Sequence, residues 1–270
     1  ALGEAAVAGR MGEVAAEALR TLGFNVNFAP VLDIASDDGA NNGLKGRYLG
    51  STIAEVVRLA GAYLEGLQHG GVIGVGKHFP GLGAALADSH SELPTIDRPR
   101  DDILKHEVAP YTELFSKINA RLNAVIIAHA HYPAFDGPSP LPSSLSKNIV
   151  TGLLREELGF KGLTITDDLE MGAITATREL PEAAVMAIEA GMDMVMVADT
   201  RSPDRATAAW EAMVKAAQEG RITRTHISRS FDHIARIKSM LSPPHAYSEQ
   251  AVARLRERIG ELNLTLQHSK

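Results

Sequence analysis

Acidic and basic side chains gather in two neighbouring segments of this 270-residue chain. Lys77 and His78 begin the run Lys-His-Phe-Pro-Gly, and Asp88-Ser89-His90 follows a stretch rich in glycine and alanine. An imidazole can give and take a proton near neutral pH, and a carboxylate two residues away can orient it. Glycine-rich connections are often mobile surface segments that carry such groups. The spacing therefore predicts a mobile acid/base pair, although Asp88 could instead cap a helix.

A further acid follows a run of mostly apolar residues. Asp167 comes directly after Leu163-Thr164-Ile165-Thr166, where a buried strand would leave the core, and Asp168 should face the other way. A carboxylate at that point can act as a nucleophile. Two adjacent acids after a strand can also cap a helix. Spacing alone leaves both interpretations open.

A pair of histidines suggests a metal site. His129 and His131 follow another apolar run, and a His-x-His pair at a strand end can hold a divalent ion. Lys77, His78 and Asp167 could then complete the centre of a metal-dependent hydrolase. Such enzymes usually carry the pair on their first strand, whereas here it follows the Lys-His strand. The metal hydrolase is therefore kept as an alternative.

The segments that must position these groups alternate between strands and helices. Apolar runs predict five strands, over 24–33, 72–78, 124–129, 163–167 and 194–197. Helices are predicted over 3–22, 52–68, 101–119, 146–158, 181–190, from 203 onward, over 226–240 and over 249–266, with Pro110 kinking the third. Near-continuous apolar strands indicate a parallel sheet covered on both faces, and parallel barrels gather polar groups at strand ends. With no Gly-x-Gly-x-x-Gly after a strand, we predict an α/β fold, a (β/α)8 TIM-type barrel lacking three strands.

The composition argues against several classes of binding partner and site. The net charge is −6 and the pI about 5.9, which argues against a nucleic-acid partner or an anionic membrane surface. The absence of cysteine excludes disulfides, thiol nucleophiles and thiolate metal sites. No apolar run reaches the length of a membrane span, and no signal peptide opens the chain. We expect a cytoplasmic protein, with export to the periplasm left open.

Read together, the motifs resemble those of glycoside hydrolase family 3, and specifically its bacterial β-N-acetylglucosaminidases that recycle peptidoglycan. The resemblance covers residues 1 to about 240. It is carried by five segments in the family's order: Asn27-Phe28-Ala29-Pro30-Val31-Leu32-Asp33, Lys77-His78-Phe79-Pro80-Gly81, Asp88-Ser89-His90, Ala128-His129, and the run from Leu153 to Leu169 that contains Gly162-Leu163-Thr164-Ile165-Thr166-Asp167-Asp168.

The resemblance implies a retaining glycosidase that removes terminal β-linked GlcNAc from peptidoglycan-derived saccharides. Asp167 would be the nucleophile, and His90 the general acid/base, oriented and favoured in its charged form by Asp88. No metal or organic cofactor is implied. Contacts to the sugar are expected from Asp33, Arg47, Lys77, His78, and His129 or Met171. A retaining phosphorylase and a non-catalytic sugar-binding remnant are the alternatives.

The resemblance also sets expectations about domains. Residues 1–241 should form the catalytic barrel, and residues 242–270 a C-terminal helix packed on it. The family's first strands would precede Ala1, so a separate N-terminal segment or a second chain is expected to complete the barrel. The sequence departs from its relatives at Leu82, where many have His, and at Glu170, where a small or polar residue is usual.

Overall fold

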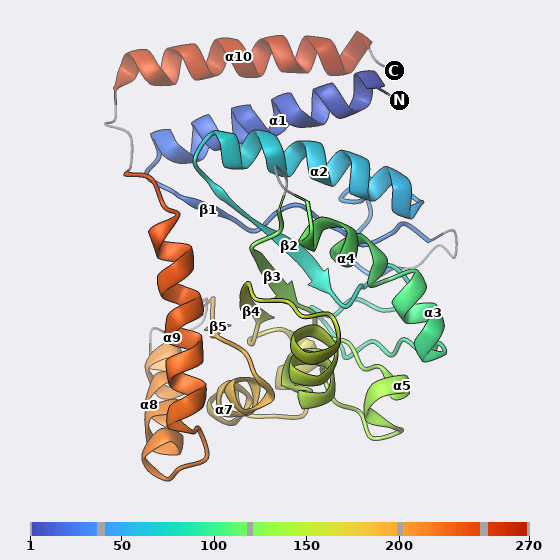
Figure 1. The fold of residues 1–270 in the computed structure, drawn as a ribbon, viewed down its shortest axis with the longest axis vertical. Helices are drawn as coiled ribbons and strands as arrows, with labels where there is room; N and C mark the ends of the chain where they lie inside the picture. The colour runs from blue at the N-terminus through green and yellow to red at the C-terminus, as the bar shows by residue number, and fades with distance from the viewer. Residues whose placement is uncertain are drawn as a thin grey trace.

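Five parallel strands curl into half of a barrel (Figure 1). The computed structural model describes residues 2–36, 41–117, 121–198, 202, 204–243 and 248–268. The strands lie side by side in chain order: β1 (Val26–Asn27), β2 (Ile73–Phe79), β3 (Ala124–Ile127), β4 (Leu163–Asp168) and β5 (Met194–Met196). This arrangement confirms the predicted barrel-type α/β class and the five strands.

Both faces of the sheet are buried, which explains the near-continuous apolar runs. Successive side chains of a strand point to opposite faces. Val75, Ile126 and Ile165 pack on one face against Ile237 of α9 (Arg224–Ser239). The other face joins a larger cluster with α2 (Ile53–His69) and α4 (Ala109–Phe115). The middle of each strand is therefore mostly apolar, and the two buried polar residues of β4, Thr164 and Thr166, form hydrogen bonds through their hydroxyls.

The helices follow the predicted order, with one correction. They are α1 (Leu2–Thr21), α2, α3 (Arg100–Lys105), α4, α5 (Pro133–Asp136), the short 3₁₀-helix η1 (Ser143–Leu145), the π-helix η2 (Asn148–Glu157), α6 (Gly172–Thr175), α7 (Leu180–Ala190), α8 (Asp204–Gln218), α9 and α10 (Glu249–His268). The single helix predicted over 101–119 is two helices, α3 and α4. Pro110 does not kink a continuous helix; it lies in the first turn of α4, where its missing N–H costs nothing. Residues 118–120 and Pro203 lie outside the described residues.

The C-terminal helix α10 lies along α1 (Figure 1). Leu255 and Leu262 bury their side chains against Val14, while Arg258 pairs with acidic residues of α1. Ile259, one turn after Leu255, is 40% exposed. Within the described residues, no helix is long and apolar enough to cross a bilayer.

A buried ionic network joins η2, β4 and α9. The Arg155 guanidinium lies 2.6 Å from Asp193 and donates to the backbone oxygens of Phe160 and Gly162. Asp193 also accepts hydrogen bonds from the backbone N–H and hydroxyl of Thr164, and lies 3.0 Å from Nδ1 of His233. Its side chain is fully buried, so the network fixes the base of the sheet to α9.

Replacing Asp193 with Ala should destabilise the protein by about 3–5 kcal/mol, because the Arg155 charge would remain buried without a counter-charge. Urea unfolding measures this difference. The control is Glu182→Ala, which breaks an exposed pair with Arg221 and should cost at most about 1 kcal/mol. Equal losses in the two variants would show that the buried network contributes no more than a surface pair.

Candidate functional site

A cavity of about 430 Å³ lies at the carboxyl ends of β2 and β4. Barrel enzymes carry their active sites at this end of the strands. Five residues singled out from the sequence meet in its wall, although they come from segments up to 120 positions apart. The lining residues are Asn42, Leu44, Arg47, Lys77, His78, Leu82, Ser89, His90 and Asp167.

Asp33 anchors one wall of the cavity from behind. Its carboxylate is 1% exposed and accepts hydrogen bonds from the N–H groups of His78 (3.2 Å) and Leu82 (2.6 Å). It also lies 2.7 Å from Nδ1 of His78. The opposite ring nitrogen, Nε2, lies 4.0 Å from the carboxylate of Asp167. Asp33 thus orients His78 toward Asp167 and does not itself line the cavity.

Asp167 shares the cavity with cationic groups. Its side chain is 18% exposed, and it accepts a hydrogen bond from the N–H of Asp168. Burial lowers the pKa of the nearby Lys77, as does the positive charge of Arg47, while the carboxylates of Asp167 and Asp33 oppose this. No helix begins at either acid: β4 runs through Asp168, and the cap of α6 is Met171. The helix-cap interpretation of the two acids is therefore wrong.

His90 stands on a long connection, residues 82–98, that we call the arm. Asp88 accepts a hydrogen bond from the His90 N–H and lies 2.7 Å from its Nδ1. Although burial acts to raise it, the pKa of Asp88 lies below its usual value because His90 donates to the carboxylate. The arm is docked after β4, where the N–H groups of Gly172 and Ala173 donate to the oxygens of His90 and Ser89. Asp88 therefore orients the imidazole instead of capping a helix, and His90 stays 64% exposed.

The structure places His129 and Met171 beneath the cavity, buried and outside its lining. His129 Nδ1 lies 2.8 Å from the hydroxyl of Ser144, and Nε2 lies 3.0 Å from the backbone oxygen of Asp168. Burial lowers the pKa of His129. His131 accepts a hydrogen bond from a backbone N–H. In the described part of the chain, no group of three or more His, Asp or Glu is placed to hold a metal ion.

The sequence reasoning missed Asn42, which joins the cavity wall to the start of the arm. Its amide donates to the hydroxyl of Tyr48 (2.8 Å) and to the backbone oxygen of Leu82 (3.2 Å). Leu82 is buried and contributes an apolar wall. The other departure, Glu170, pairs with Arg205 at 2.5 Å, away from the cavity lining.

Glu107 was also missed, although its pKa is strongly shifted. It is 4% exposed, one carboxylate oxygen lies 3.2 Å from Arg98, and the other has no hydrogen-bond partner among the described residues. Burial raises the pKa of Glu107 to about 7; Arg98 opposes this and the charge of Asp33 adds to it. One pattern in the sequence indicates that Glu107 could be buried. Ile103 and Tyr111 lie four residues before and after it, at helical spacing, and both are buried in the structure.

The raised pKa of Glu107 should make folding less favourable as the pH rises from about 4.5 to about 7. A carboxyl that binds its proton more tightly when folded stabilises the protein fully below its unfolded pKa, and loses this contribution above the folded value. The shift corresponds to roughly 3 kcal/mol. Urea titrations between pH 5 and 8 should show Glu107→Gln losing less stability than the unchanged protein. Equal slopes for both proteins would contradict this prediction.

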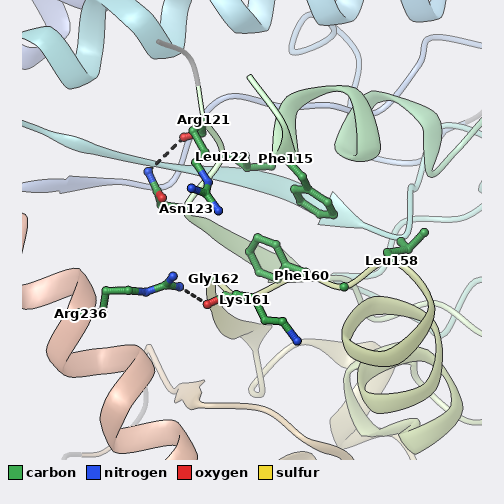
Figure 2. A pocket seen from close by; sticks show the side chains of 10 residues that line it. Phe115, Arg121, Leu122, Asn123, Leu158, Phe160, Lys161, Gly162 and Arg236 are labelled. Atoms are coloured by element: carbon green, nitrogen blue, oxygen red, sulfur yellow. Dashed lines mark hydrogen bonds between the residues drawn. The ribbon is translucent and has the colours of Figure 1, made fainter. Parts of the chain in front are cut away.

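A second, smaller cavity lies at the opposite end of the sheet, where β3 and β4 begin (Figure 2). Phe115 and Phe160 stack in its wall, and Arg236 donates to the backbone oxygen of Lys161. None of the residues predicted for the site lies there. We therefore assign the candidate site to the cavity around Asp167.

A curled parallel sheet with a polar cavity at the carboxyl ends of its strands defines a (β/α)-barrel domain. Residues 1–237 match the sequence model of the Glycosyl hydrolase family 3 N terminal domain. The chain is also 34% identical to a β-hexosaminidase of Idiomarina loihiensis over 192 residues, which cover 71% of this chain and 55% of that protein. The chain therefore belongs to glycosyl hydrolase family 3.

Solved structures give the same assignment. A family 3 β-N-acetylglucosaminidase from Paenibacillus sp. str. FPU-7 superposes with a TM-score of 0.83 at 34% identity, covering 95% of this chain and 51% of that one. A β-glucoside phosphorylase superposes with a TM-score of 0.76 at 25% identity, covering 95% and 49%. The chain thus spans about half the length of these relatives.

Proposed function

We propose that the protein is a retaining β-N-acetylglucosaminidase that hydrolyses terminal β-linked GlcNAc in peptidoglycan-derived saccharides. One observation carries the proposal: a single cavity is lined by both Asp167 and His90, and His90 is hydrogen-bonded to Asp88. A fixed carboxylate facing an imidazole that can exchange protons is the minimum that two-step glycoside hydrolysis requires. The similarity to proteins named β-hexosaminidase supports the choice of sugar.

In the proposed reaction, Asp167 attacks the anomeric carbon and displaces the leaving group, which takes a proton from His90. The resulting glycosyl ester is then attacked by water, whose proton returns to His90. Asp88 holds the ring through Nδ1, which leaves Nε2 as the nitrogen that exchanges the proton. Each step therefore has a proton donor or acceptor within the cavity.

Binding of the sugar is proposed to rest on hydrogen-bond donors. Lys77, Arg47 and His78 line the cavity beside Asp167 and can donate to sugar hydroxyls. Asp33, the fourth proposed contact, accepts three hydrogen bonds within the chain, so its present contribution is to hold His78 in place. A contact from His129 or Met171 would require either side chain to reach past the cavity wall.

Aryl β-glycosides of N-acetylglucosamine, glucose and xylose, assayed side by side, test the proposed function. Turnover of the N-acetylglucosaminide in preference to the other two is the expected result. Undiminished turnover after treatment with a chelator would remove the metal-hydrolase alternative. Binding of GlcNAc without turnover of any of the three would overturn the proposal and favour a sugar-binding remnant.

A retaining phosphorylase is the second candidate. Arg47 and Lys77 stand beside Asp167 and could hold phosphate, and the fold is similar to that of a β-glucoside phosphorylase. A histidine that has lost its proton is neutral and does not repel an incoming anion, as a carboxylate would. Adding phosphate to the assay distinguishes the two: GlcNAc 1-phosphate indicates a phosphorylase, and free GlcNAc a hydrolase.

We also propose that further strands, from an N-terminal segment or a second chain, complete the half-barrel. Among the described residues, β1 and β5 each pair with one strand only. Exposed apolar side chains lie near both ends of the sheet: Phe24 and Phe28 beside β1, and Trp210 on α8. Intact mass and sedimentation of the purified protein test this proposal. A stable monomer of 270 residues alone would contradict it.

A further inference from the structure

Glu107 lies where two parts of the site meet. The first is the turn at Gly81, directly after the Lys77-His78 segment: a Cβ added to Gly81 would come within 2.9 Å of the unpaired Glu107 oxygen. The second is Arg98, at the end of the arm, which pairs with the other oxygen. Glu107 thus lies against the turn before the His90 segment and pairs with Arg98 after it.

The arm is held at both ends by buried acids. At its start, the N–H of Leu82 donates to Asp33. At its end, Arg98 pairs with Glu107. Between these points, His90 is held by a backbone contact to Gly172. Near this end, the backbone of Pro94 and Ile96 also pairs with that of His131, so loss of the Arg98 contact would weaken the attachment of the 17-residue connection without releasing it, and would thereby loosen the position of His90.

A purely structural function does not account for a carboxylate at this position. Glu107 is buried near the fully buried Tyr111 and Tyr132, and it feels the charges of Arg98 and Asp33. A buried acid with one unpartnered oxygen opposes folding, whereas an apolar residue would not. Residues that break such rules are expected where function requires them.

We propose that Glu107 is a positioning residue for the arm: it holds Arg98 and the Gly81 turn together and thereby keeps His90 over the cavity that contains Asp167. It touches no substrate, and its effect passes through the arm. The inference rests on the proposed function, in which His90 transfers the proton.

Three variants test the inference: Glu107→Gln, Arg98→Met and the two combined. Each single variant should lower kcat for the aryl N-acetylglucosaminide by about tenfold, because His90 is misplaced, and change KM by no more than about twofold. The double variant should be no slower than either single one, since both disrupt the same ion pair. The matched control is Glu157→Gln, which removes an exposed ion pair with Arg100 and should leave kcat unchanged.

Hydrogen exchange tests the positioning role of Glu107 independently of glycosidase activity. Backbone amides of residues 82–98 should exchange faster in Glu107→Gln than in the unchanged protein or in Glu157→Gln. If the unchanged protein hydrolyses no glycoside, the proposed function fails, while faster exchange in the arm still supports the positioning role. Unchanged exchange in the arm, or losses of kcat that add up in the double variant, would overturn it.

Discussion

Replacing Asp167 with Gly is expected to abolish glycoside hydrolysis, with a loss of roughly 10⁴-fold or more in kcat. The proposed reaction forms its covalent bond through this carboxylate, and no other acid lines the cavity among the described residues. Folding should be little affected, because the side chain is partly exposed and, within the described residues, accepts a hydrogen bond only from the neighbouring N–H of Asp168. Steady-state kinetics and urea unfolding of the same preparation measure the two effects separately.

Azide tests directly whether Asp167 is the nucleophile. The Gly variant leaves room beside the anomeric carbon, where azide can replace the missing Asp167 carboxylate and displace an activated leaving group. The product should be the α-glycosyl azide, because attack comes from the face that Asp167 occupied. Asp168→Asn is the matched control. It removes the same charge one residue away, outside the cavity lining, and should lower kcat by less than about tenfold. Equal losses of kcat in the two variants would show that activity depends on negative charge in this region and not on a nucleophilic carboxylate at Asp167.

Local patterns in the sequence were enough to predict most of the fold. Apolar runs indicated the five strands because each strand is buried on both faces. The helix predicted from residue 52 begins at Ile53, after a capping box formed by Thr52 and Glu55. The pattern failed at the first strand, predicted over 24–33, which pairs regularly only at Val26–Asn27. Pro30 has no N–H to donate to a neighbouring strand, so regular pairing stops before it.

The site was predicted less completely, since its supporting contacts are long-range. Lys77 and Asp167 line the cavity and stand out in the sequence as polar residues in or after apolar runs, whereas His90 was found by its spacing from Asp88. Asp33 was found too, but its three hydrogen bonds join positions 45 and 49 residues apart, which no local pattern specifies. Glu107 was missed because a single acid within a predicted helix normally faces solvent.

Replacing His90 with Ala should slow hydrolysis of substrates with poor leaving groups by about 10²–10⁴-fold, because these require a proton in the first step. Nitrophenyl glycosides need little protonation, so their first step should remain fast. Their second step should become slow, since no base then activates water. The glycosyl ester on Asp167 would accumulate, which predicts a burst of nitrophenol and a lowered KM. His69→Ala, at the exposed end of α2, is the control and should behave like the unchanged protein.

Azide distinguishes His90 from Asp167 by the stereochemistry of the product. In His90→Ala the ester still forms, and azide can attack it without a general base from the face opposite Asp167. The product should therefore be the β-glycosyl azide, whereas Asp167→Gly should give the α-azide. Addition of azide should also restore the rate of the second step, and the β-product should be visible by proton NMR. An α-azide from His90→Ala, or no acceleration by azide, would mean that His90 does not activate water. The acid/base would then have to be sought in another residue of the cavity.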